Sequence, residues 1–236
     1  MNICIVSIYS FPKGLAPTNR ILAYSKGLVL NGADVCVYMP FPTDRICKNI
    51  LPDAGIYENI NYVYTTGRYK SNSKIIRGLA TFLGIRKIIG YVKTFIKIVH
   101  DARHSHISVL IISTDHIISL FIFSLLARRI GAKSVFIFDE YPIPIRHKLK
   151  DKIPFWKEVL YKLVLKKVDA YISISETLRN YYSQLVNKPS FILSGITDVS
   201  RFDILEELES NNSSPYLCYM GNMELAKDDV DNIIRA

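Results

Sequence analysis

Short apolar runs without alternation are the feature that most constrains how this chain can fold. They include "NICIVSIY", "ADVCVYMP", "HISVLIIST", "SVFIFDE" and "DAYISIS". Because nearly every position in such a run is apolar, a strand built from it is expected to bury both of its faces. Segments with helical spacing separate most of the runs, and in "TNRILAYSKGLVLNG" we expect Thr18 to cap the helix and Gly32 to stop it. The pattern predicts an α/β fold, with a doubly wound parallel sheet covered by helices on both faces.

A change in composition predicts a domain boundary. The alternation of strands and helices runs to about residue 198, and the polar stretch "LEELESNNSSP" that follows is typical of a linker. The segment "PYLCYMGNMELAKDDVDNIIRA" then predicts a strand, a turn and half a helix, which cannot bury their own apolar face. We therefore expect a first domain over 1–198, a linker over 199–215 and the start of a second domain over 216–236.

Charge and cysteine content narrow the classes of partner and compartment. The net charge of +9 favours phosphates, nucleic acid or an anionic membrane surface, without choosing among them. The four cysteines form no CxxC pair, so we expect buried thiols rather than zinc or redox chemistry. Met1 leads straight into an apolar run without a signal peptide, and "IISLFIFSLLA" is shorter than the roughly 20 residues of a membrane span. These features predict a cytoplasmic chain.

The loop after the first apolar run is a candidate binding site, because ligands of parallel sheets bind at the carboxyl ends of the strands. This loop, "SFPKGLAPTNR", contains Lys13, Gly14, Thr18 and Arg20. It lacks the GxGxxG pattern with which backbone approaches a pyrophosphate, so a dinucleotide oxidoreductase is not expected. A helix N-terminus with two cations suits an anion, and an ordinary loop with solvated Lys and Arg is the alternative.

Later loops add two carboxylates and a histidine. Asp139 and Glu140 are adjacent, so in a strand they point to opposite faces and do not share a proton; at most one faces the cleft. His116 is a candidate general base or hydrogen-bond donor, with a structural role at a helix start as the alternative. The segment "HSH" has two imidazoles and no third ligand, so we expect no metal site.

Residues 73–100 predict one long helix or two shorter ones, and Gly78, Gly84 and Gly90 favour a break. Six cations alternate there with apolar residues: Lys74, Arg77, Arg86, Lys87, Lys93 and Lys97. Such a helix can lie on an anionic membrane, and a sheet-covering helix with a solvated basic face is the alternative. The aromatic residues show no RNP-like pattern, so nucleic acid is not an expected partner.

Four segments have the order of motifs in a known family: "FPKGLAPTNRILAYSKGLVLNGADVCVYMP", "VDAYISISETLRNYY", "FILSGITDVSRF" and "YLCYMGNMELAKDDVDNIIRA". The third looks like the family's crossing between two domains, with Ser194 in place of an Asn, and the fourth looks like the start of its donor-binding domain. The chain thus resembles the N-terminal, Rossmann-like domain of a GT-B glycosyltransferase in the retaining family 4 group. The first strand-helix unit of the second Rossmann-like domain is expected to follow it.

The resemblance implies transfer of a sugar from a nucleotide-sugar donor to a glycan or a lipid-linked saccharide, in the synthesis of cell-surface polysaccharide. It implies retention of anomeric configuration, no cofactor and no bound metal, since cations and helix N-termini stabilise the leaving diphosphate. Donor-phosphate binding is expected at Gly221, Asn222 and Lys227. His116 and Asp139 are the candidate catalytic residues, by position alone. The acceptor-side residues are expected to be Lys13, Gly14, Thr18, Arg20, Glu140 and Arg146.

Two alternatives stay open beside this hypothesis. Because the resemblance includes one strand-helix unit of the donor domain, the chain is expected to be an incomplete fragment that is inactive alone. The first alternative is a non-catalytic half that binds an acceptor or a partner and meets a separately encoded donor domain. The second is a basic module that binds the inner face of an anionic membrane.

Overall fold

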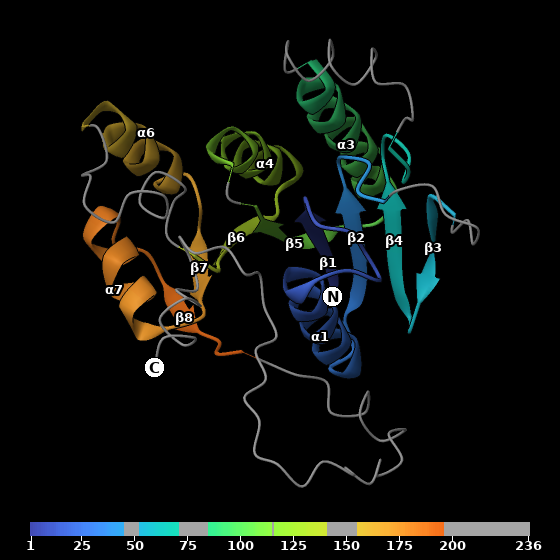
Figure 1. Ribbon diagram of the computed structural model, residues 1–236, viewed down its shortest axis with the longest axis horizontal. Helices are drawn as coiled ribbons and strands as arrows, with labels where there is room; N and C mark the ends of the chain where they lie inside the picture. The colour runs from blue at the N-terminus through green and yellow to red at the C-terminus, as the bar shows by residue number, and fades with distance from the viewer. Residues whose placement is uncertain (45–51, 71–84, 115, 141–154, 196–236) are drawn as a thin grey trace, which may run out of the picture.

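The computed structural model describes residues 1–44, 52–70, 85–114, 116–140 and 155–195. These residues form an eight-stranded sheet with helices on both faces (Figure 1). The strands are β1 (Asn2–Ser7), β2 (Asp34–Met39), β3 (Ala54–Tyr57), β4 (Ile60–Tyr64), β5 (Ile107–Ser113), β6 (Lys133–Phe138), β7 (Ala170–Ser173) and β8 (Ser190–Ile192). The helices are α1 (Ala16–Leu30), α3 (Ile85–His104), α4 (Ile117–Ile130), α6 (Phe155–Leu165) and α7 (Glu176–Leu185).

The strand order β3-β4-β2-β1-β5-β6-β7-β8 places β1 inside the sheet, between β2 and β5. Neighbouring strands are parallel, except that β3 runs antiparallel to β4 at the edge. The chain moves outward from β1 to one edge and then returns to β5 on the other side of β1. This reversal is a topological switch point, where open α/β sheets bind their ligands. The structure confirms the doubly wound α/β fold and adds an antiparallel edge strand.

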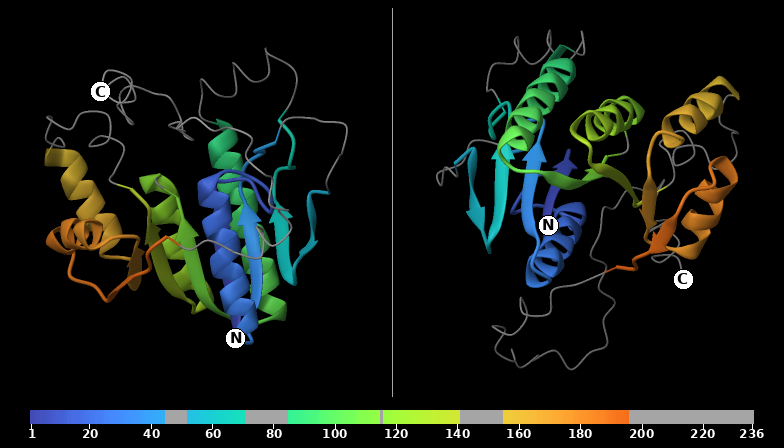
Figure 2. Two further views of the ribbon diagram at one scale, coloured as in Figure 1. Left: turned by 60° about the horizontal axis from the view of Figure 1, so that its bottom comes forward. Right: turned by 180° about the vertical axis from the view of Figure 1, so that it is seen from behind.

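Two apolar layers hold the helices against the sheet. Along β1, Ile3 and Ile5 face the layer under α1, whereas Cys4 and Val6 face the layer under α3, α4, α6 and α7. Figures 1 and 2 show α1 on one face and α3, α4 and α6 side by side over the other. Because both faces are covered, the strands carry the continuous apolar runs that mark them in the sequence.

The edge strand β3 has little sequence signature, and the sequence analysis does not anticipate it. It is joined to β4 by Glu58 and Asn59, whose φ angles are 48° and 62°. Both residues are left-handed, as a two-residue hairpin turn of this hand requires. The turn contains neither Gly nor an Asn-Gly or Asp-Gly pair, so the usual signal for a hairpin is missing.

Helix α1 begins earlier than expected, and the predicted capping role of Thr18 is wrong. Leu15 occupies the position before the first turn and makes no side-chain cap. Pro17 fits into the first turn because an N–H at that position has no partner within the helix. Thr18 instead donates its hydroxyl to the backbone oxygen of Ser10, at 2.6 Å. Gly32 follows the helix with a φ of 78°, in agreement with its expected role as a stop.

Helix α3 continues through Gly90, so the break expected at this residue is wrong. A Cβ at Gly90 would lie 2.5 Å from the carbonyl oxygen of Pro40 and 2.6 Å from a ring carbon of Phe41. The glycine therefore permits close packing against the end of β2. Gly78 and Gly84 lie outside the described residues, as do the predicted linker and the predicted second domain.

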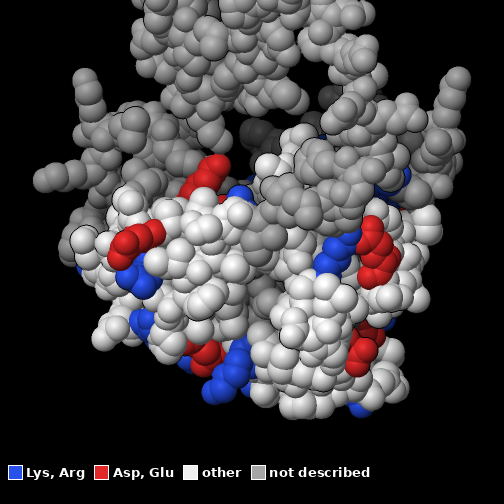
Figure 3. All heavy atoms as spheres, turned by 90° about the horizontal axis from the view of Figure 1, so that it is seen from below, with Lys and Arg blue, Asp and Glu red and all other residues white. Residues whose placement is uncertain are grey.

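Charged residues of both signs lie near one another on the side of the molecule shown in Figure 3. No large patch of one sign is visible there among the described residues. The excess of positive charge in the composition therefore does not form a single basic surface on this side, where a nucleic-acid backbone would need one.

Candidate functional site

The loop between β1 and α1 lies at the switch point and is held in place by β4. The backbone N–H of Phe11 donates to the hydroxyl of Tyr64 at 2.9 Å, and the same hydroxyl donates to the Phe11 carbonyl at 3.1 Å. Thr43 Oγ1 lies 3.0 Å from this hydroxyl. Burial raises the pKa of Tyr64 despite these hydrogen bonds, so the phenol stays protonated at neutral pH. The start of the loop is thus a fixed part of the sheet edge.

The other end of this loop turns tightly at Gly14. A Cβ at this position would lie 2.3 Å from both Ser10 Oγ and Thr18 Oγ1, so only a glycine fits without rearrangement. Ser10 Oγ donates to the carbonyl of Lys13 at 2.8 Å and so closes the turn. The side chain of Lys13 is exposed beside it. This lysine is a cation that a ligand at the carboxyl edge can reach.

Arg20 has a different environment from the exposed cation that the sequence suggested. Its guanidinium forms an ion pair with Asp139, the residue directly after β6, and each side chain is 20% exposed. Tyr24 is buried one turn further along α1. Its pKa is raised above the ordinary value, chiefly by burial; Asp139 adds to this rise and Arg20 opposes it. The structure therefore brings together two predicted site residues, and it adds Tyr24. The i, i+4 spacing of Arg20 and Tyr24 was the available sequence signal.

His116 lies between β5 and α4, at the same edge of the sheet. Its backbone N–H donates to Thr114 Oγ1 at 3.1 Å, and its side chain makes no capping hydrogen bond to α4. The predicted position of His116 after a strand and before a helix is confirmed. Its catalytic role stays a prediction.

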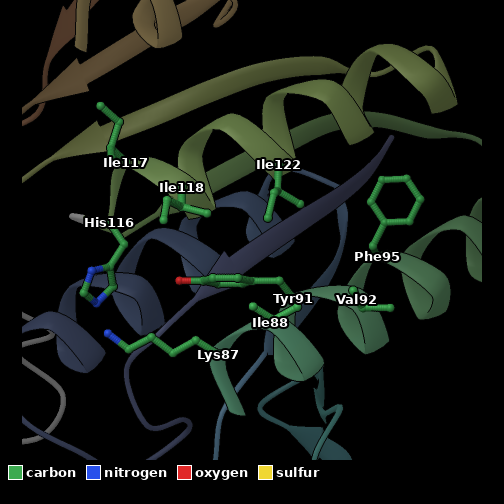
Figure 4. Close-up of a pocket in the computed structure, with 9 residues that line it drawn as sticks. All are labelled: Lys87, Ile88, Tyr91, Val92, Phe95, His116, Ile117, Ile118 and Ile122. Atoms are coloured by element: carbon green, nitrogen blue, oxygen red, sulfur yellow. The ribbon is translucent and has the colours of Figure 1, made fainter. Parts of the chain in front are cut away.

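A groove of about 530 Å³ extends from His116 between α3 and α4 (Figure 4). Most of its lining is apolar: Ile88, Tyr91, Val92, Phe95, Ile117, Ile118 and Ile122. Lys87 and His116 lie at one end, and the hydroxyl of Tyr91 points toward that end. His116 was a predicted site residue, but its proximity to α3 was not predicted from the sequence. The signal for this contact was the helical spacing of Ile88, Val92 and Phe95.

A second groove, of about 600 Å³, lies between α4 and α6. It shares Ile117 and Ile118 with the first groove. Its basic residues are Arg128, at the C-terminal end of α4, and Lys166 and Lys167, which follow α6. The face of the sheet that α3, α4 and α6 cover thus presents apolar grooves with cations beside them.

The remaining predicted site residues are Glu140 and four residues that lie outside the described part of the chain. Glu140 is exposed beyond β6, and its backbone carbonyl accepts a hydrogen bond from the Tyr182 hydroxyl at 3.4 Å. Arg146 lies outside the described residues. Gly221, Asn222 and Lys227 lie outside them as well, and their donor-phosphate role stays a prediction.

Within the described part of the chain, no three His, Cys, Asp or Glu residues are grouped as metal ligands would be. Burial raises the pKa of the Cys4 thiol well above its ordinary value, and it raises that of Cys36 to about 11. Both thiols are free and protonated at neutral pH, as expected for structural cysteines. Among the helices described, none is both long and apolar enough to cross a membrane.

The topology and the fixed loop define a doubly wound α/β domain, and the ends of β1 and β5 are its candidate ligand-binding edge. No protein-family model and no curated protein sequence matches the chain. Solved structures do resemble it. Sucrose-phosphate synthase from Thermosynechococcus elongatus superposes with a TM-score of 0.58 at 10% identity, over 84% of this chain and 49% of that chain. Apo UGT2 from Phytolacca americana gives 0.51 at 11% identity, over 84% and 52%.

The chain spans about half the length of these two structures. They are GT-B glycosyltransferases, so the expected resemblance to this class is confirmed at the level of the fold. At 10% and 11% identity, the likeness carries no substrate and no catalytic residue across to this chain. The retaining family 4 group stays a prediction.

Proposed function

We propose that this chain forms the acceptor-side part of a GT-B glycosyltransferase of the retaining family 4 group. It would act in the transfer of a sugar from a nucleotide-sugar to a glycan or a lipid-linked saccharide. One observation carries the proposal: the fixed loop after β1 and the start of α4 follow two neighbouring strands at the switch point of a fold that sucrose-phosphate synthase shares. The motifs at 168–182 and 191–202 support the family assignment.

The proposed roles follow from the charges and the exposure of the site. Lys13 is exposed and would attract a negatively charged group of the acceptor or the donor. His116 would bind the acceptor hydroxyl and accept its proton. The ion pair of Arg20 with Asp139 would hold the N-terminal half of α1 against the end of β6. Gly221, Asn222 and Lys227 would bind the donor diphosphate, and no metal is required for this step.

The test is sugar transfer by the full protein from its native cells, with radiolabelled nucleotide-sugars as donors and cell-envelope extract as acceptor. We expect His116→Ala to lower kcat about 100-fold or more, as loss of a general base does. Lys13→Gln should mainly raise KM, because it removes charge attraction. Arg103→Gln, in the last turn of α3, is the matched control and should leave both constants unchanged. Transfer that His116→Ala leaves unchanged would exclude the proposed role of His116, and the absence of transfer with every donor would exclude the enzyme.

A second candidate is a non-catalytic half that meets a separately encoded donor domain. The observation that favours it is that the described residues form one doubly wound domain with apolar cores on both faces of its own sheet. The intact mass in native cells distinguishes the two candidates. A mass well above 27.0 kDa supports a single enzyme with its own donor domain. A mass of 27.0 kDa, with transfer only after a second polypeptide is added, supports the split arrangement.

We also propose that the protein lies at the inner face of a membrane, where lipid-linked acceptors reside. Support comes from exposed apolar side chains on α3 and α4, among them Ile96 and Ile118, and from the cations beside the second groove. Apolar contact together with attraction of cations to anionic lipid is typical of interfacial binding. Flotation with phosphatidylglycerol vesicles should recover the protein at low salt and lose it as salt screens the cations. Equal flotation with vesicles of neutral lipid would exclude the electrostatic part.

A further inference from the structure

We propose that the groove between α3 and α4 binds an aliphatic chain with a phosphate at its end, which is the lipid part of the acceptor. The inference rests on the proposed sugar transfer and names the class of substrate at that site. It assigns a place in the structure to the lipid, which neither the fold nor the sequence motifs do. Three features of the groove lead to it: its lining, its polar end and its position.

The lining of the groove matches a hydrocarbon chain. Its volume of about 530 Å³ is within the range of small-molecule pockets, and α3 and α4 supply apolar side chains on both sides. Several of these side chains are partly open to solvent: Ile88 is 62% exposed, Val92 51% and Ile118 65%. A bound alkyl chain would cover apolar surface that is otherwise in contact with water, which is favourable in proportion to the area covered.

The polar groups of the groove gather at one end, which matches a ligand with a single anionic head. Figure 4 shows the amine of Lys87 and the imidazole of His116 at this end, with the Tyr91 hydroxyl pointing toward them. Val92, Phe95 and Ile122 lie at the other end. Among the described residues that line the groove, none is acidic, so none of these side chains repels a phosphate.

The polar end also lies at the edge where transfer would take place. His116 follows β5 at its carboxyl end, and Lys87 lies in the first turn of α3. Gly90, one turn after Lys87, packs against Pro40, directly beyond the end of β2. A phosphate at Lys87 and His116 would therefore be near the switch point, with its alkyl chain directed away along the helices. The cations of the second groove lie at the C-terminal ends of α4 and α6, whereas His116 precedes the N-terminus of α4. The second groove therefore does not place a phosphate near the switch point.

The binding test uses monomeric dodecyl phosphate and isothermal titration calorimetry at pH 7, with no sugar donor present. We expect saturable binding of one molecule per chain. Inorganic phosphate lacks the alkyl chain and dodecanol lacks the charge. Each should bind at least about tenfold more weakly than dodecyl phosphate, because each loses one of the two contributions to binding.

Two pairs of variants on α3 make the test specific. Val92→Asp places a charge in the groove and should abolish binding. Ile96→Asp, at an exposed position of the same helix that does not line the groove, should leave binding unchanged. Lys87→Gln should weaken binding of dodecyl phosphate about tenfold, as loss of a charge-assisted hydrogen bond does, and leave dodecanol unaffected. Lys93→Gln, outside the groove, is its control. Circular dichroism of each variant shows that the fold is kept.

Each contrary result has a distinct meaning. Equal losses in Val92→Asp and Ile96→Asp would show that the whole face attracts alkyl chains and would overturn the groove as a site. Binding to phosphatidylglycerol vesicles without binding of dodecyl phosphate would show a membrane contact alone and would overturn it as well. Normal sugar transfer by Val92→Asp to a lipid-linked acceptor would overturn the groove but not the enzyme. Binding of dodecyl phosphate without sugar transfer to any acceptor would overturn the proposed function and leave the site itself standing.

Discussion

Arg20 of α1 and Asp139 after β6 form an ion pair across the switch-point edge of the sheet. The two residues are far apart in the sequence, and each had been selected from it for a separate reason. Their pairing ties the start of α1 to a strand two places away from β1. It also means that the charge of each is largely balanced by the other, so the exposed cation of this loop is Lys13.

The pair should stabilise the protein by a measurable coupling. A double-mutant cycle with Arg20→Gln and Asp139→Asn, followed by urea unfolding, should give a coupling energy of about 1 kcal/mol, because both side chains are partly shielded from solvent. Arg179 and Glu176 on α7 form a more exposed pair and serve as the control, with a coupling close to zero. Equal couplings for both pairs would contradict the prediction.

Arg68 and Asp44 should respond unequally to substitution. Arg68 is buried, lies over the rings of Tyr62 and Tyr64, and donates from Nε to Asp44 Oδ2 at 2.5 Å. Asp44→Ala leaves a buried guanidinium without its carboxylate and should cost about 3 kcal/mol in the free energy of unfolding. Arg68→Met removes the buried charge and leaves the Asp44 carboxylate, which is partly exposed to solvent. This variant should therefore lower the free energy of unfolding by less. Thermal unfolding of both variants compares the two costs, and the reverse order would exclude this account of the pair.

Acid should destabilise the protein through Asp101 and Asp169. Burial acts to raise the pKa of each, but hydrogen bonds outweigh it: Lys97 and Tyr38 donate to Asp101, and the N–H and hydroxyl of Ser134 donate to Asp169. Both pKa values are thus lowered from 3.8 in the folded state. A lowered folded pKa gives stability that is present above the ordinary value and is lost as the pH falls below it.

Urea unfolding between about pH 6 and pH 3 checks this linkage. The free energy of unfolding should stay level at first and fall as the pH drops below 3.8. Asp169→Asn should lower stability at neutral pH by about 1 kcal/mol and flatten the fall in acid. Asp34→Asn, at an exposed position, should leave the curve unchanged. A curve for Asp169→Asn that is parallel to that of the unsubstituted protein would contradict the assignment.

Gly90 and Gly27 should give opposite effects when replaced by alanine. Both are inside helices, where alanine is intrinsically favoured over glycine by about 1 kcal/mol. At Gly27 no atom lies within 4 Å of the added Cβ, so Gly27→Ala should stabilise the protein by up to that amount. At Gly90 the Cβ would collide with Pro40 and Phe41, so Gly90→Ala should destabilise it. Melting temperatures of the two variants test this, and a rise for both would show that α3 can shift away from β2.

The sequence predicted the strands and helices better than the tertiary contacts between them. The apolar runs of β1, β2, β5, β6 and β7 were recognisable because strands buried on both faces are apolar at most of their positions. Ser175 caps α7 through its hydroxyl, which accepts the N–H of Leu178, and this cap was not among the expectations from the sequence. The start of α1 was misjudged because Thr18 satisfies Ser10 across the loop, a contact that has no local pattern. Gly90 was taken to favour a helix break, whereas the structure shows that it permits close packing of α3 against the end of β2.

For the site, the positions of Lys13, Gly14, His116 and Asp139 at strand ends could be read from the sequence, since the carboxyl edge of a parallel sheet follows from strand order. The partner of each could not. Tyr64 holds the loop after β1, Arg20 pairs with Asp139, and α3 completes the groove at His116. Each of these contacts joins segments that are distant along the chain.

The class of fold could therefore be predicted from the order of the residues, because burial on both faces and helical spacing are local properties of the chain. The tertiary structure decided which charges are balanced and which apolar faces stay open. The pairing of charges and the covering of apolar faces depend on how the strand order places segments that are far apart in the sequence. Arg20 and Asp139 meet only because β6 and α1 share one edge of the sheet, and the groove exists only because α3 and α4 lie side by side on one face.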